Sequence, residues 1–220
     1  MSSDGNGTAT STAIRIFDVK PGIFKILLDF IYLSATPEIE DEADARDLLI
    51  AVDRFRCVPL KLYAESVLAD RFLTVSNAAA MLLLADSRSC AMLKEASTGL
   101  FLAYPRAVMA AREDWARVRE SRRLLDELLV AFSHTSERWN DGDDDEPKND
   151  GDEDRTDDGD DDHDDDYGAA VEAMDVIGLR RALEDAGLEL DGSRDMLVRR
   201  LRSQSSDSSG GWETLQETTE

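Results

Sequence analysis

A run of acidic residues divides this chain, and it restricts the possible folds more than any other feature. Residues 140–166 contain 17 acidic and 2 basic side chains, so they hold −15 of the total net charge of −23. Such a run repels itself and offers almost no apolar side chain to a core. We therefore expect an extended, disordered linker over residues 136–166, with a folded segment on each side.

The first residues of the chain carry two different patterns. Residues 1–12 are small and polar, with nothing to bury, and they predict a disordered leader. In residues 13–19, Ile14 and Ile16 fall on one face of an extended segment, which predicts one short strand.

From Pro21 to about residue 135 the apolar spacing is that of helices. We expect a series of short amphipathic helices with short connections, one of them capped by Thr74 or Ser76. The first two apolar stripes contain Phe24, Leu27, Leu28 and Ile31, then Leu48, Leu49, Val52 and Phe55. The fold class is therefore predicted as mostly α.

Beyond the linker, residues 167–203 predict a much smaller folded unit of two helices. Gly187 is expected to end the first helix and Ser193 to cap the second. The apolar faces of these helices contain Val176, Leu179, Leu183 and Ala186, then Leu197 and Leu201. Residues 204–220 return to a polar composition and predict a disordered tail.

The sequence offers no pattern typical of an enzyme, a metal site or a membrane protein. No apolar run approaches the roughly 20 residues that cross a bilayer, and residues 1–12 do not resemble a secretory signal, so we expect an intracellular protein. His134 and His163 lack a Cys, His or Ser constellation, so no catalytic residue, metal or cofactor is expected. Cys57 and Cys90 lie in apolar helical patterns, which favours buried free thiols over a disulfide.

Several sequence blocks before the linker, taken in order, resemble a known family. They are Ile16–Phe24, Leu27–Tyr32, Asp47–Phe55, Leu60–Glu65, Val75–Ala79 and Leu84–Asp86. Their order and spacing resemble the C-terminal half of a BTB/POZ domain, placed at residues 13–88. The speckle-type POZ branch is the most similar, and its trailing helical extension would correspond to residues 89–135.

That resemblance implies a partial BTB/POZ fold that binds a cullin scaffold. The family's N-terminal half, with its strand pair, dimerisation helix and scaffold-gripping segment, has no counterpart in residues 1–12. We therefore expect a monomer unless an upstream half of the domain exists. The remaining cullin-facing surface would contain Tyr32, Leu33, Leu73 and Asn77. Simple packing at helix ends is an alternative interpretation of Tyr32 and Leu73.

The unit after the linker is similar to a SAP domain, a small helix-loop-helix module of chromatin proteins. The resemblance is carried by Leu179–Leu183, Gly187–Gly192, Arg194, Leu197, Arg200 and Leu201. In that family basic side chains contact DNA phosphates, a role that would fall here to Arg180, Arg181, Arg194, Arg199, Arg200 and Arg202. Because residues 167–202 hold 6 bases and 7 acids, a solvated helix face remains the alternative.

Two functions from different classes follow. The first is a non-enzymatic adaptor that recruits substrates to a cullin-type ubiquitin ligase, with the SAP module directing it to the nucleus or chromatin. The second is a chromatin-associated DNA- or histone-binding protein with a truncated BTB interaction platform. The acidic linker would bind basic proteins or act as a solubilising spacer. The location would be nuclear or nucleocytoplasmic.

The tail carries one short linear motif. Trp212 and Leu215 have the aromatic-x-x-aliphatic spacing by which an extended peptide adds a strand to a ubiquitin-like partner. Residues three apart in an extended strand can enter separate pockets, so the spacing is physically suitable for such docking.

Overall fold

The computed structural model describes residues 16–140 and 163–208, and the fold in these ranges is mostly helical, as predicted. The N-terminal unit, residues 16–140, contains α1 (Pro21–Leu33), α2 (Glu42–Arg54), α3 (Val58–Val67), the π-helical turn η1 (Leu68–Phe72), α4 (Ala78–Arg88), α5 (Ala91–Ala103), α6 (Pro105–Met109), α7 (Arg112–Glu120) and α8 (Arg122–Asn140). The C-terminal module, residues 163–208, contains α9 (His163–Ala173), α10 (Val176–Asp185) and α11 (Arg194–Ser208). The predicted leader, the centre of the acidic run and the Trp212–Leu215 motif lie outside the described residues.

Local sequence signals set where several helices begin and end. Proline occupies the first turn of α1, α3 and α6, where its missing N–H costs no hydrogen bond. At the start of α2, the Asp41 side chain accepts a hydrogen bond of 2.8 Å from the backbone N–H of Asp44. Gly187 adopts a φ of 68° two residues after the end of α10, which confirms its predicted role in ending that helix.

The predicted strand does not form in its described part. Residues 16–19 have no strand structure, and Asp18 has a φ of 62°. A strand needs a neighbour to satisfy its backbone groups, and no described segment pairs with this one. The spacing of Ile14 and Ile16 in the sequence was compatible with one face of a strand, but it could not show whether another strand lies beside it.

The predicted cap of α4 is also corrected. Asn77 occupies the position before the helix, whereas Thr74 and Ser76 direct their hydroxyl groups toward each other, 3.0 Å apart. The Asn77 side chain instead closes the preceding turn by accepting a hydrogen bond of 2.8 Å from the backbone N–H of Thr74.

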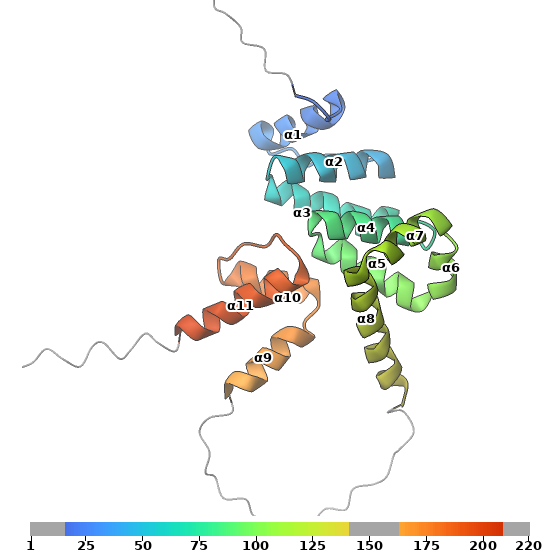
Figure 1. The fold of residues 1–220 in the computed structure, drawn as a ribbon. Coiled ribbons are helices and arrows are strands. Elements are labelled where there is room, and N and C mark those ends of the chain that lie inside the picture. Colours follow the sequence, from blue (N-terminus) through green and yellow to red (C-terminus); the bar gives the residue numbers. More distant parts are fainter. Residues whose placement is uncertain (1–15, 141–162, 209–220) are drawn as a thin grey trace, which may run out of the picture.

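Three hydrophobic clusters hold the described elements together. The first contains residues of α1, α2, α3, η1, α4 and α5, and the second contains residues of α4, α6, α7 and α8. The third is the core of the C-terminal module, and it includes Ala91 from the start of α5. Figure 1 shows α1, α2, α3 and α4 as successive layers of the N-terminal unit, with α10 beside α5 and α11 packed against α9 and α10.

Helices extend into both ranges that the sequence predicted as disordered. Helix α8 runs to Asn140, α9 begins at His163, and α11 runs to Ser208. Leu124 and Leu128 anchor the first half of α8, and a helix that is already nucleated adds further residues at little cost. No helix in the described ranges is long and apolar enough to cross a membrane.

Candidate interaction surface

Two oppositely charged residues of α3 are buried where the C-terminal module meets the N-terminal unit. Lys61 and Glu65 are four residues apart, so they share one face of the helix. Lys61 is 3% exposed and Glu65 is fully buried. Charged groups are rarely buried in this way unless each has a partner, and both partners come partly from the module.

The Glu65 carboxylate joins three helices. Its Oε1 atom accepts hydrogen bonds from the backbone N–H groups of Met92 at 2.7 Å and Leu93 at 3.1 Å, in the first turn of α5. These donors lack partners inside their own helix, so the carboxylate acts as a cap supplied from a distance in sequence. Its Oε2 atom lies 2.5 Å from Nη2 of Arg180 on α10.

Lys61 makes the second charged connection, with the charges reversed. Its Nζ atom lies 2.8 Å from Asp53 Oδ1 on α2 and 2.8 Å from Asp191 Oδ1 in the loop before α11. Burial by itself would lower the pKa of Lys61, but the hydrogen bonds to Asp191 and Asp53 outweigh it and raise the pKa. Lys61 therefore stays charged. Two ion pairs thus connect the units: the N-terminal unit supplies the basic residue of the Lys61–Asp191 pair, and the module supplies the basic residue of the Arg180–Glu65 pair.

Backbone and apolar contacts surround these pairs. Gly192 forms a β-bridge with Cys90, immediately before α5. The Glu95 side chain accepts a hydrogen bond of 3.1 Å from the backbone N–H of Val176, at the start of α10. Ala91 completes the module's apolar core. Cys90 is a buried free thiol, as the sequence indicated, and burial raises its pKa far above its usual range. Cys57 is also free but only half-buried, because it lies just before the start of α3.

The sequence predicted two folded segments joined by a linker and no contact between them, so Lys61, Glu65 and Asp191 were not identified as contact residues. The apolar spacing predicted short amphipathic helices in this part of the chain, but we made no prediction for the two charged residues of α3. Their opposite charges, four residues apart beside the apolar stripe of that helix, were the available signal. The sequence alone could not indicate that another segment covers this face.

The six predicted DNA-contacting arginines fall into two groups. Arg180, Arg194 and Arg200 are partly buried and occupied within the protein: Arg194 donates to the backbone carbonyls of Glu172 and Met174, and Arg200 donates to those of Glu189 and Asp191. Arg181, Arg199 and Arg202 are exposed. Arg202 pairs with Glu172 at 2.8 Å, whereas Arg181 and Arg199 make no ion pair with any described residue.

The four predicted cullin-facing residues also differ in their environments. At the end of α1, Tyr32 is 79% exposed and Leu33 is 70% exposed. Leu73 is half-buried and packs against both hydrophobic clusters of the N-terminal unit. The Asn77 side chain donates hydrogen bonds of 2.9 Å to Glu42 Oε2 and to the Phe72 carbonyl, so it is a structural connection between α2 and the start of α4.

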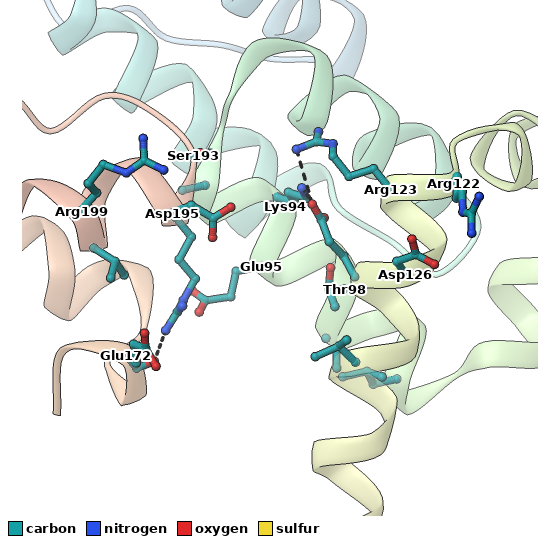
Figure 2. A pocket seen from close by; sticks show the side chains of 18 of the residues that line it. Lys94, Glu95, Thr98, Arg122, Arg123, Asp126, Glu172, Ser193, Asp195 and Arg199 are labelled. Carbon is teal, nitrogen blue, oxygen red and sulfur yellow. Dashed lines mark hydrogen bonds and ion pairs between the residues drawn. The ribbon is translucent and has the colours of Figure 1, made fainter. Parts of the chain in front are cut away.

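A groove of about 1410 Å³ opens between α5, α8 and the C-terminal module, and Figure 2 shows its lining. Its charged side chains have both signs, and several neutralise one another. Lys94 of α5 contacts Asp86 at 3.0 Å and Glu127 of α8 at 2.5 Å, and Arg123 of α8 also pairs with Asp86. No group of side chains in the described ranges could hold a metal ion.

Comparison with known proteins gives relatives that share part of this sequence, although no family model matches it. TD and POZ domain-containing protein 1 of Mus musculus is 34% identical over 110 residues, which are 50% of this chain and 30% of the relative. TD and POZ domain-containing protein 4 of the same species is 32% identical over 123 residues, or 56% of this chain and 33% of the relative. The match thus spans about a third of these relatives, and it supports a BTB/POZ domain in this chain.

Proposed function

We propose that this chain is a protein-interaction adaptor whose N-terminal unit binds a cullin-type ubiquitin-ligase scaffold. The similarity to POZ domain-containing proteins supports the interaction role. The observation that carries the proposal is the cluster of three consecutive exposed apolar side chains, Ile31, Tyr32 and Leu33, at the end of α1. A partner that covers them removes a large apolar area from water.

The position of this cluster suits an adaptor. Helix α1 is the outermost layer of the N-terminal unit, far from the C-terminal module (Figure 1). A scaffold bound there would leave the module and the groove beside α5 accessible to a second partner. Aromatic side chains such as Tyr32 often dominate the binding energy of an interface once they are fully covered.

Binding of the full chain to a recombinant cullin scaffold tests this proposal. We expect the double variant Tyr32→Asp and Leu33→Asp to bind at least about tenfold more weakly, because it places two charges in an apolar contact. The matched control is Leu129→Asp on α8, since Leu129 is 67% exposed and the same type of change is made outside α1.

Loss of binding in the double variant with retention in the control supports the cullin-facing role of α1. The proposal is rejected if the unaltered chain does not bind the scaffold, or if Leu129→Asp is as damaging as the double variant. Leu73 and Asn77 are less suitable positions for this test because both also support the fold.

A second candidate function is DNA binding by the C-terminal module. It is favoured by Arg181 and Arg199, two exposed guanidinium groups that no described acid neutralises. Titration of a fluorescent random-sequence duplex at several salt concentrations tests it. We expect Arg181→Glu and Arg199→Glu to weaken binding and to reduce the salt slope by about one for each lost phosphate contact.

Arg119→Glu on α7 is the control for overall charge, since Arg119 is exposed and belongs to the N-terminal unit. An equal loss of affinity in this control would assign the effect to net charge and reject a phosphate-contacting role of the module.

A further inference from the structure

We propose that docking of the C-terminal module on α3 and α5 is an autoinhibitory contact that withholds Arg180 from polyanions. The module would use this arginine on a DNA duplex only after it leaves the N-terminal unit. This inference rests on the second candidate function, DNA binding by the module, and it adds a control on that function that lies within the chain itself.

The Arg180 guanidinium is already occupied in the docked module. Its side chain is 13% exposed, its Nη2 atom lies 2.5 Å from Glu65 Oε2, and its Nε atom donates to the Leu190 carbonyl at 3.3 Å. The neighbouring Arg181 is exposed on the same helix. One of two adjacent arginines is thus available to solvent, and the other is turned into the contact between the units.

A phosphate and the Glu65 carboxylate compete for the same guanidinium. Both are anionic acceptors that form charge-assisted hydrogen bonds with arginine. Because Glu65 belongs to the N-terminal unit, Arg180 cannot serve a duplex while the module stays docked. The apparent affinity for a polyanion then equals the affinity of the released module multiplied by the fraction of molecules in the released state.

The contact can be opened without changing any arginine. Asp191 of the module pairs with buried Lys61, so Asp191→Lys places two like charges together in a buried site. Gly192 offers a second route with no change in charge. It is buried, has a φ of 132°, and an added Cβ would lie 3.2 Å from Met196. Gly192→Ala therefore displaces the backbone that bridges to Cys90.

The first measurement reports docking. A protease site is placed in the full chain within residues 141–162, the protein is cleaved, and the two halves are followed by size-exclusion chromatography. We expect the native halves to elute together and the halves of Asp191→Lys and Gly192→Ala to separate. Circular dichroism of each uncut chain checks that the variants remain helical.

The second measurement is the affinity of each uncut chain for a random-sequence DNA duplex. We expect Asp191→Lys and Gly192→Ala to bind about tenfold more tightly than the native chain, and the addition of Arg180→Glu to remove this gain. Asp185→Lys is the control, because it makes the same charge change at an exposed position of α10 that has no ion pair with described residues.

Three results would overturn the proposal. Native halves that separate at once would show that docking is too weak to inhibit anything. Released variants that bind no more tightly than Asp185→Lys would show that Arg180 is not the withheld group. Absence of duplex binding in every variant, with native halves that still elute together, would reject the DNA function while leaving the docking contact intact.

Discussion

Glu65 is a carboxylate with no exposed surface, and its contacts explain how the fold accommodates it. It accepts two backbone hydrogen bonds at the start of α5 and one ion pair from Arg180. Such a network balances the cost of removing a charge from water only while all its members are present. The stability of the fold and the docking of the module therefore depend on the same atoms.

Glu65→Ala removes the acceptors of Met92 and Leu93 and leaves Arg180 without its carboxylate. We expect it to lower the free energy of unfolding by about 3 kcal/mol, measured by urea denaturation. Glu172→Ala is the control. Glu172 is exposed and pairs with Arg202 at the surface, so its loss should cost less than about 1 kcal/mol. Equal effects would contradict the role given to the buried carboxylate.

Asp86 gives the fold a dependence on pH. Burial by itself would raise its pKa, but hydrogen bonds from Lys94 and Arg123 outweigh it and hold the pKa below the ordinary value of 3.8. An acid whose pKa is lower in the folded state stabilises the fold above its unfolded pKa, and this contribution disappears as the pH falls through the folded value.

We therefore expect the native chain to lose stability in acid as the pH falls below about 4, and Asp86→Asn to show a shallower loss over the same range. Thermal unfolding at a series of pH values measures both curves. Parallel curves for the two proteins would show that Asp86 does not contribute.

At the level of single residues, the sequence could indicate where side chains lie along a helix but not which partners they meet. The arginines of the module were all candidates for phosphate contact by type and position. The structure separates Arg181 and Arg199, which face solvent, from Arg180, which meets an acid 115 residues earlier in the chain. Such a long-range pairing leaves no trace in local spacing.

Among the elements, the turn between η1 and α4 shows how a candidate binding residue can be a structural one. Asn77 connects Glu42 of α2, the Phe72 carbonyl and the Thr74 N–H through one side chain. We expect Asn77→Ala to lower the free energy of unfolding by about 1 kcal/mol, because it removes three hydrogen bonds, two of them partly buried.

Tyr32→Ala is the comparison for that measurement. Its side chain is 79% exposed, so the change should shift the free energy of unfolding by no more than about 0.5 kcal/mol. A large loss of stability in Tyr32→Ala would show that α1 needs this side chain for packing.

The helices themselves could be predicted because their signals are local. Proline in the first turn of α1 and α6, the apolar stripes and Gly187 after α10 all act within a few residues of the feature they indicate. The strand expected at residues 13–19 required a partner from elsewhere in the chain, and its described part is not a strand. Two further differences lie beside the acidic run: α8 continues past its predicted end because a nucleated helix extends at little cost, and α9 was not predicted, since the expected two-helix pattern begins at Val176.

For the whole molecule, the acidic run predicted a folded segment on each side of it, and the structure packs these two segments together. The composition of the acidic run gives no information about which residues of the two flanking segments contact each other. The contact is made by Lys61, Glu65, Arg180 and Asp191, all charged residues that a sequence pattern assigns to solvent. Which charged residues pair and become buried is decided only when the two segments pack together in the folded protein.

The C-terminal module should consequently fold by itself but be less stable than it is when docked. We expect a peptide of residues 163–208 to be helical by circular dichroism and to unfold at a higher temperature when residues 1–140 are added, because Ala91 and Glu95 then complete its core and the start of α10. The same peptide with Arg180→Glu should show no such increase. An unfolding temperature of the native peptide that residues 1–140 leave unchanged would contradict this expectation.

The position of Ala91 limits how the protein can change over evolutionary time. One methyl group at the start of α5 belongs to the apolar core of a module that begins more than 70 residues later. A module that borrows part of its interior from a neighbour is not readily portable, since transfer to another host protein would leave a gap in its core and a charge on Arg180 without its buried carboxylate. The two units are therefore expected to be inherited together, with substitutions on one side of the contact matched by substitutions on the other.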